Sequence, residues 1–392
     1  AGAYAYKLYQ GGVSDPADGS WYLRSQLDES PEVPEQPEPP VEPGPGTPTP
    51  PTKPLYQAGV PVYEAYPQIL LGLNTLPTLQ QRVGNRSWGS GTQVDNTALD
   101  AGTASSTIEQ NGVWGRVEGS HTRMSPRRST SNVQYEVDTV KMQLGFDGLL
   151  HENESGKWLA GIQANYVHGS ADIWSPHDSD GGKGKIKTDG VGFGTTLTWY
   201  GHSGAYVDGQ AQAMWYDSKL YSDGGKRSLA PKNEGFSYAF SVETGKRTAL
   251  NQNWSLTPQA QLTYSNVSFK DFTDTFGADV KLESADSLQA RLGLAIERQS
   301  NDYGVNNKTS RSHVYGIVNL YYDFLNGTKV KVANTQFTNR NDELFAGIGV
   351  GGSYNWNKDK YSLYGEASVN TGLSNFGDSR SYKGIVGLRI RW

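Results

Sequence analysis

The chain has 392 residues, a formal net charge of −5 and a mean hydropathy of −0.61, and it contains no cysteine. Because Lys and Arg are interspersed with Asp and Glu, no basic surface of the kind that binds nucleic acid is indicated. The lack of cysteine excludes disulfides, thiolate catalysis and Cys-ligated metals. No apolar run approaches the ~18 residues of a spanning helix, whereas the 47 Gly, 23 Tyr and 10 Trp are typical of transmembrane β-barrels.

The first 60 residues predict a hairpin followed by a spacer. Residues 1–27 alternate around a turn at DPADG, which indicates two strands that would close a sheet or solenoid; a disordered start is the alternative. Residues 28–60 are the spacer, because eleven prolines and four glutamates between positions 31 and 54 favour an extended, polyproline-like chain. A ligand for SH3-type domains is the alternative there. Since residues 1–10 lack a signal peptide, we expect the chain to be the C-terminal part of a longer precursor.

Residues 61–110 contain a helical periodicity and then a polar loop. In VYEAYPQILLGLNTLPTLQQRVGNRSW, residues 62–88, apolar side chains recur every three or four residues. Pro77 interrupts this pattern, so we expect one kinked helix or two short ones, with Asn74 or Thr75 capping the second. The residues expected to form the helical segment are Ile69, Leu70, Leu73, Leu76, Leu79, Gln80, Arg82 and Val83.

From residue 111 onward, apolar and polar side chains alternate with the two-residue period of a β-strand. Twelve such stretches can be counted, roughly 111–124, 133–150, 157–174, 186–200, 204–217, 235–248, 253–269, 286–299, 312–325, 342–357, 360–371 and 381–392. Short turns alternate with longer polar loops, 326–341 among them, as in transmembrane barrels of even strand number. The connection at 300–311 is too long for a short turn, so either this turn is extended or a hairpin is missing from the count.

The polar positions of these strands predict the lining of a pore. We expect a water-filled lumen lined by Arg116, Glu118, Asp147, Gln163, Asp208, Gln210, Glu243, Arg291, Glu297, Asp323, Glu343 and Glu366. A helix is ~10–12 Å across. A barrel of twelve strands is wider than an eight-stranded barrel, which side chains fill, and narrower than a sixteen-stranded barrel, which forms an open channel. One helix therefore fits, so these side chains either contact it or solvate a narrow pore. The expected fold class is all-β: a 12-stranded antiparallel transmembrane β-barrel with an α-helical segment in the pore.

The last strand, YKGIVGLRIRW, has a regular apolar face. Tyr382, Val386, Leu388, Ile390 and Trp392 all lie at even positions and are expected to face lipid. The strand must pair with the first one, because an open edge in hydrocarbon leaves backbone groups unpaired. A regular edge strand also suits β-augmentation onto another sheet, so these five residues are a candidate assembly signal. Aromatic residues near the short turns predict a belt at that rim; they are Trp158, Trp199, Trp254, Trp356 and Tyr361, together with Trp392.

The order of these parts resembles the translocator of a monomeric autotransporter (type V secretion) of the pertactin and AIDA-like adhesin type. The resemblance rests on AYAYKLYQGG and WYLRS, the Pro/Glu spacer, VPVYEAYP, NGVWGRVEG and the terminal GIVGLRIRW. It implies that residues 1–27 are the C-terminal end of the passenger (a β-solenoid cap), 28–60 a linker, 61–110 the linker helix inside the pore and a loop, and 111–392 the barrel. It also implies a Gram-negative outer membrane, with the passenger, an adhesin, exported to the cell surface and anchored there.

The resemblance implies partners as well. They are the chain's own passenger domain, outer-membrane lipid and lipopolysaccharide, periplasmic chaperones and the barrel-assembly machinery, which would recognise the C-terminal pattern; a monomer is expected. Some members of the family cut their own chain at an Asn-Asn dipeptide in the helix region, and residues 62–88 contain none. The alternative function is a self-standing outer-membrane porin or adhesive barrel with a periplasmic N-terminal arm.

No enzyme, cofactor or metal site is predicted. The six histidines are scattered and form neither an HExxH motif nor an i,i+4 pair. Asp172, His177, Asp178 and Asp180 could be read as a metal cluster, and a solvated glycine-rich loop is the simpler interpretation. The sequence therefore predicts a secretion device without catalytic residues.

Overall fold

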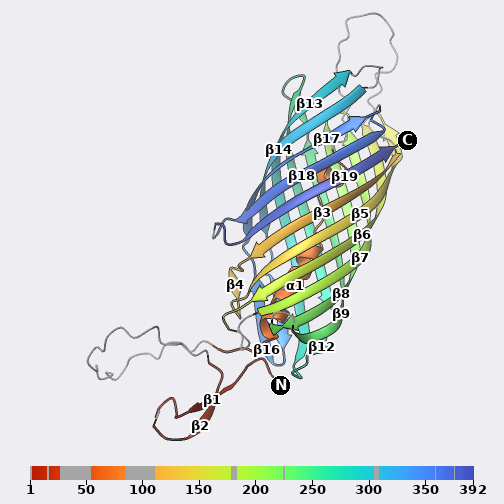
Figure 1. The fold of residues 1–392 in the computed structure, drawn as a ribbon. Coiled ribbons are helices and arrows are strands. Elements are labelled where there is room, and N and C mark those ends of the chain that lie inside the picture. The colour runs from red at the N-terminus through yellow and green to blue at the C-terminus, as the bar shows by residue number, and fades with distance from the viewer. Residues whose placement is uncertain are drawn as a thin grey trace, which may run out of the picture.

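Twelve long antiparallel strands form a closed barrel in the computed structural model, which describes residues 2–15, 17–26, 54–84, 111–177, 183–223, 226–303, 309–357, 359–374 and 376–392 (Figure 1). The barrel strands are β3 (Asn111–Met124), β5 (Gln134–Asn153), β6 (Gly156–Trp174), β7 (Lys183–Gly201), β8 (Ala205–Ser222), β9 (Arg227–Lys246), β11 (Trp254–Phe269), β13 (Asp279–Tyr303), β14 (Thr309–Asp323), β17 (Leu344–Trp356), β18 (Tyr361–Gly372) and β19 (Arg380–Arg391). The expected fold class is confirmed. The spacer at 28–53 and the stretch 85–110 lie outside the described residues.

The barrel closes where its last strand pairs with its first. The register of β19 on β3 runs from Arg380 opposite Arg123 to Arg391 opposite Gly112. This pairing satisfies the backbone groups that an open edge would leave without partners. At the connection 300–311, β13 continues to Tyr303 and β14 starts at Thr309, and these two residues are paired, so no hairpin is missing from the count.

The two rims of the barrel differ. The rim that carries the turns after β5, β7, β9, β13 and β17, with the C-terminus, is called here the short-turn rim, and it also holds β10 (Thr248–Ala249). The opposite, long-loop rim carries four further short strands, β4 (Arg128–Ser129), β12 (Phe272–Thr273), β15 (Thr328–Val332) and β16 (Thr335–Arg340). The hairpin β15–β16 pairs with the start of β13 and with β4. Treating 326–341 only as a loop was therefore wrong, because an extension of β13 gives this segment a strand to pair with.

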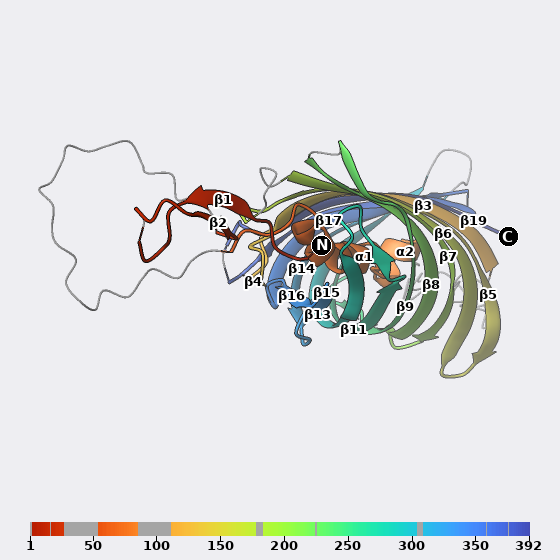
Figure 2. The same ribbon diagram turned by 90° about the horizontal axis from the view of Figure 1, so that it is seen from below.

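The N-terminal residues lie outside the barrel, at the long-loop rim. Strands β1 (Lys7–Gln10) and β2 (Trp21–Arg24) form a two-stranded antiparallel sheet beyond this rim (Figure 1). The chain then enters the barrel as α1 (Val60–Leu73) and α2 (Leu79–Val83), and Figure 2 shows both helices inside the ring of strands. Among the described residues, no helix combines the length and the apolarity needed to cross a membrane.

The sequence explains where these helices begin and end. Pro61 lies in the first turn of α1, where a missing N–H is tolerated, and all residues of α1 except Gln68 and Gly72 are buried. The helix ends at Leu73 ahead of Pro77, and α2 starts only after Thr78, whose side chain forms a capping box with Gln81. The break at Pro77 is confirmed.

Two finer expectations for this segment were wrong. The second helix is capped by Thr78, because Asn74 is the C-cap of α1 and Thr75 lies between the helices. Leu76 is not helical but belongs to the same connection. Helix α2 ends at Val83, with Gly84 as its C-cap.

The outer face of the barrel carries the apolar positions of the alternation. In β6, for example, Ile162 is 65% exposed whereas Gln163 is only 4% exposed. The aromatic residues assigned to a belt lie at the short-turn rim: the ring of Trp356 stacks 5.6 Å from that of Tyr361, and Trp392 stacks 6.0 Å from Phe146. The rim that holds these rings is thus the expected one.

Candidate functional site

Residues 54–84, called here the pore segment, run through the interior of the barrel from one rim towards the other. At the long-loop rim, the ring of Tyr56 packs edge-on against Phe337 of β16 at 5.1 Å. In the short-turn half, Leu79 and Val83 of α2 pack in an apolar cluster with Trp114 near the start of β3. Figure 1 shows α1 lying along the barrel axis between these two ends. The segment therefore occupies the path that a translocated chain would take.

One side of the long-loop half of the pore is filled by apolar side chains. Buried residues of α1 pack there against residues of the strands, of the segments that connect them and of the β15–β16 hairpin; these are Val133, Tyr135, Val137, Val167, Ala171, Ile173, Ile186, Met214, Tyr216, Leu220, Leu229, Ala230, Val267, Phe269, Ala278, Val280, Ala285, Val330, Val332 and Phe337. The expected water-filled lumen is thus wrong for this side of the long-loop half. Alternation identifies the inward positions, but those near the long loops are apolar.

A buried carboxylate joins α1 to the loop after β3. Glu64, only 1% exposed, accepts hydrogen bonds from Ser129 Oγ at 2.5 Å and from the N–H groups of Thr130 and Ser131 at 2.9 Å each. The same loop holds β4, which pairs with β16. Glu64 therefore links the pore segment, through β4, to the β15–β16 hairpin.

The pore segment does not fill the lumen evenly. Helix α1 contacts β5, β6, β7, β8, β11 and β13, with β15 and β16, on one side of the barrel. On the opposite wall, the inward positions Ser120, Ser368 and Lys383 stay partly exposed. A polar, solvent-accessible strip therefore remains beside α1, so the expectation of a wet lumen holds for this wall.

Between the helices, glutamine side chains from β8 supply hydrogen bonds that the broken helix lacks. Gln212 Nε2 donates to the backbone carbonyl of Asn74 at 3.0 Å, and Gln210 Nε2 donates to that of Pro77 at 2.8 Å. Asn74 Nδ2 donates to Ser265 Oγ at 2.7 Å. Because the carbonyls at a buried helix end need partners, these contacts explain how the connection is tolerated at this depth.

The central charge of the pore segment is Arg82, which is 1% exposed. Its guanidinium lies 2.6 Å from Asp208 Oδ1 and 3.6 Å from Asp147 Oδ1, and it also donates to Thr198 Oγ1 at 3.3 Å. Both carboxylates come from the barrel wall and are themselves buried. A cation in the segment is thus matched by two anions on the wall, which fixes α2 laterally.

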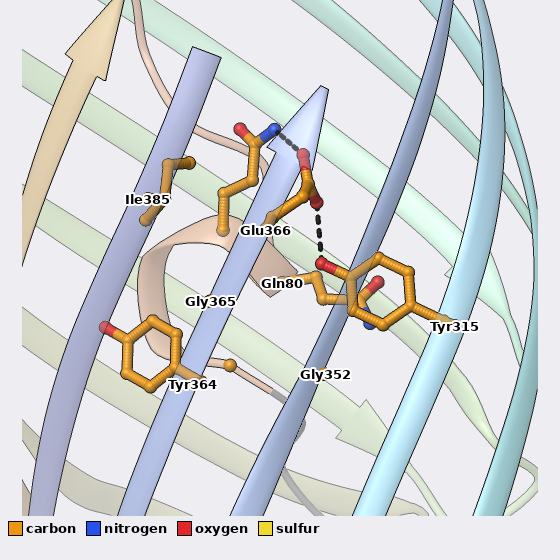
Figure 3. A pocket seen from close by; sticks show the side chains of 9 residues that line it. Gln80, Tyr315, Gly352, Tyr364, Gly365, Glu366 and Ile385 are labelled. Atoms are coloured by element: carbon orange, nitrogen blue, oxygen red, sulfur yellow. Dashed lines mark hydrogen bonds between the residues drawn. The ribbon is translucent and has the colours of Figure 1, made fainter. Parts of the chain in front are cut away.

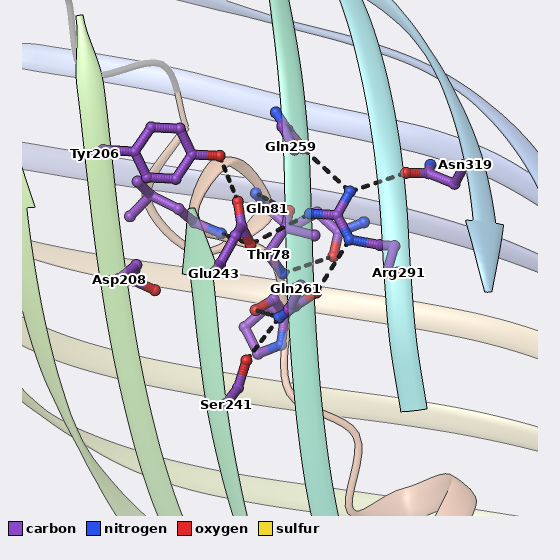
Figure 4. Close-up of polar contacts among 12 residues, drawn as sticks. Thr78, Gln81, Tyr206, Asp208, Ser241, Glu243, Gln259, Gln261, Arg291 and Asn319 are labelled. Carbon is purple, nitrogen blue, oxygen red and sulfur yellow. Dashed lines mark hydrogen bonds and ion pairs between the residues drawn. The ribbon is translucent and has the colours of Figure 1, made fainter. Parts of the chain in front are cut away.

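The start of α2 is held by a second buried carboxylate. Glu243 accepts from the N–H of Leu79 at 3.1 Å and from Tyr206 Oη at 2.6 Å, and it lies 3.4 Å from the guanidinium of Arg291 (Figure 4). Arg291 in turn donates to Gln259, Gln261 and Asn319 of neighbouring strands. An acidic group at the N-terminus of a helix is favourable because free N–H groups and the helix dipole point towards it.

The end of α2 is held by cations and tyrosines. Arg389 Nη1 donates to the carbonyl of Val83 at 2.6 Å, and Tyr364 Oη donates to that of Arg82 at 2.6 Å. Figure 3 shows the neighbouring contact, in which Glu366 accepts from Gln81 Nε2 at 2.7 Å and from Tyr315 Oη at 2.6 Å.

Gly84 ends α2 and requires the absence of a side chain. Its φ is +70°, and a Cβ there would lie 2.8 Å from the ring of Tyr364. No other residue would fit this conformation and this close approach at low cost.

The structure divides the twelve residues assigned to the lumen into three groups. The residues in direct contact with the pore segment are Arg116, which donates to the carbonyl of Gln81, and Asp147, Asp208, Gln210, Glu243 and Glu366. Those buried in the wall around the segment are Glu118, which pairs with Arg116, Glu297, which pairs with His313, and Arg291 and Gln163.

The remaining two, Asp323 and Glu343, lie at the long-loop rim. There Asp323 accepts from Ser287 Oγ, and Glu343 pairs with Arg340 at 2.7 Å. They are only partly buried, so they line the rim and not the closed part of the pore. The reason is that alternation gives the face of a strand but not the height at which the pore segment passes.

Several residues that hold the pore segment were not among the predicted lumen residues: Gln212, Tyr206, Tyr364, Arg389 and Lys141, whose Nζ donates to Thr75 Oγ1 at 2.6 Å. All of them occupy inward positions, so their parity was available. Their contacts with residues 74–83 depend on the axial position of the helices, which no local pattern reveals.

The comparisons with known proteins agree with this arrangement. Residues 113–368 match the family described as autotransporter beta-domain. The chain belongs to this family. It is 46% identical over 396 residues to the adhesin BmaC autotransporter of Brucella suis biovar 1 (strain 1330), an alignment that covers all of this chain and 11% of that protein. The chain thus spans about a tenth of the length of that relative.

Two solved structures share the fold. The transport unit of the autotransporter AIDA-I from Escherichia coli superimposes with a TM-score of 0.64 at 15% identity, covering 85% of this chain and 99% of that one. The beta domain of the Bordetella autotransporter BrkA gives a TM-score of 0.54 at 21% identity, covering 72% of this chain and all of that one. As an autotransporter β-domain, this barrel is an outer-membrane translocator of a Gram-negative bacterium that exports a passenger to the cell surface.

Proposed function

We propose that this barrel exports the polypeptide that precedes α1 and afterwards holds it at the cell surface through the pore segment. The main support for this proposal is the course of the chain. Residues 54–57 lie at the long-loop rim, α1 and α2 lie in the pore, and β3 starts at the short-turn rim. With long loops outward, a chain on this path leaves the pore at the cell surface. The buried contacts of Glu64, Arg82 and Glu243 then act as the anchor.

We further propose that the passenger is an adhesin. The support is the 46% identity to a Brucella autotransporter named as an adhesin. In this proposal residues 1–27 are the end of the passenger, 28–60 the linker, 61–110 the pore segment with its loop, and 111–392 the translocator. Its partners are the passenger, periplasmic chaperones, the barrel-assembly machinery and outer-membrane lipid, and the barrel acts as a monomer without catalysis.

Two measurements test the export and the anchor. Protease added to intact cells should remove residues 1–54, whereas protection of this segment would favour a periplasmic arm and contradict the proposal. Deleting residues 60–84 should raise the single-channel conductance of the purified barrel severalfold, because the charged wall would then face water. An unchanged conductance would mean that the pore segment does not close the pore.

A further inference from the structure

The outer face of β6–β9 changes from apolar to charged at one level. Trp158 and Tyr166 bound the apolar stretch of β6; they are eight residues apart, or about 26 Å along the strand and roughly 20 Å along the axis of a barrel tilted by ~40°. This height is close to the ~25 Å apolar band of such barrels. At its long-loop side, Trp215 of β8 lies 5.4 Å from Phe236 of β9, ring to ring. These rings mark the upper limit of the hydrocarbon.

Immediately beyond the rings lies a row of carboxylates that have partners within the protein. Asp189, Asp217 and Glu234 face one another across β7, β8 and β9. Asp189 accepts from Tyr166 Oη and lies 2.9 Å from His168 Nδ1. Lys232 lies 3.6 Å from Asp217 and 3.5 Å from Glu234. Asp217 and Glu234 are thus paired with Lys232, whereas Asp189 is hydrogen-bonded to Tyr166 and His168.

One step further out, two lysines face each other without such partners. Lys187 of β7 is directly opposite Lys219 of β8, and both are exposed. Within the described residues neither has a carboxylate within ion-pair distance, whereas Lys185 on the same strand lies 3.1 Å from Asp172. Like charges directly opposite on neighbouring strands repel each other. The pair thus presents two exposed ammonium groups beyond the aromatic rings, and that of Lys219 also attracts the carboxylate of Asp189.

We propose that Lys187 and Lys219 bind a phosphate of a lipopolysaccharide headgroup, while the rings of Trp215 and Phe236 lie against its acyl chains. The position of the lysines along the barrel axis supports this ligand, since phosphates of an outer-leaflet glycolipid lie where the apolar band ends. The positive charge of both side chains complements the negative charge of such a phosphate. The proposal rests on the part of the proposed function that directs the long loops outward, and it gives one of the expected lipid contacts a defined site.

The test measures binding of lipid A to the purified full chain in detergent. Bisphosphorylated lipid A is titrated and bound lipid is counted by native mass spectrometry, with dephosphorylated lipid A as the second ligand. The variant Lys187→Gln/Lys219→Gln should bind the phosphorylated lipid roughly ten- to thirtyfold more weakly. Lys187→Arg/Lys219→Arg should keep the affinity. The matched control, Lys329→Gln/Lys331→Gln, removes the same charge from β15 and should change nothing.

Each other outcome would overturn the proposal. Equal weakening in the β15 control would indicate a general effect of net charge. Equal binding of dephosphorylated lipid A would show that phosphate is not recognised, and displacement of the lipid by millimolar inorganic phosphate would indicate an unspecific anion patch. Heat-modifiable mobility on gels verifies that each variant forms a closed barrel. Because this assay requires no passenger, lipid binding can be absent while surface export in cells stays intact. Equally, surface export can be absent while the purified barrel still binds the lipid.

Discussion

Replacing Arg82 by Met should release the pore segment from the barrel wall. Arg82 is 1% exposed and lies 2.6 Å from Asp208 and 3.6 Å from Asp147. Removing one partner of a buried ion pair costs ~3–5 kcal/mol, because the remaining charge is left without compensation. Asp208 keeps hydrogen bonds from Thr198 and Gln210, so we expect the lower end of this range, about 3 kcal/mol.

The assay is urea unfolding of the purified barrel in detergent, followed by tryptophan fluorescence. Arg298→Met provides the control, because Arg298 lies on the outer face, 5.9 Å from the centre of the Trp254 ring. Adding Asp208→Asn to Arg82→Met should recover part of the loss, with a coupling of ~0.5–3 kcal/mol.

The single-channel conductance provides a second readout, since a loosened pore segment should produce open events that the unchanged chain lacks. If Arg82→Met costs no more free energy of unfolding than Arg298→Met, the buried ion pair does not hold the segment.

Three further predictions concern the end of α2, the loop that Glu64 binds and the C-terminal residue. Gly84→Ala should lower the free energy of unfolding by ~1–3 kcal/mol, since a side chain at φ +70° is strained. The control Gly72→Ala lies at an open helical position and should raise the free energy of unfolding by up to ~1 kcal/mol. Equal effects of the two substitutions would contradict the docking of α2. Glu64→Ala should expose the 125–131 loop to protease on intact cells, whereas Glu136→Ala, at an exposed ion pair, should not; identical cleavage patterns would remove the role assigned to Glu64. Deleting Trp392 should slow insertion in cells much more than it lowers the melting temperature of refolded protein, and a proportional loss of both would leave Trp392 as an ordinary member of the aromatic belt.

The sequence by itself determined the wall of the barrel. The two-residue period is local, and lipid on one side enforces it along every strand, so twelve strands, their inward positions and the closure of β19 on β3 could be predicted. The break of the helical segment followed in the same way, because a proline acts on the turn that contains it.

Only the tertiary structure decided what fills the pore. Contacts across the lumen join residues far apart in sequence, such as Arg82 and Asp208, which are 126 positions apart. A side chain's parity shows that it points inward but not the height at which it meets the helices, so Arg389 and Tyr364 were missed and Glu343 was placed too deep. The apolar packing against α1 was hidden for the same reason. Its residues come from the ends of strands between β5 and β13 and from the β15–β16 hairpin, and they form one cluster only when the barrel places them against the same helix.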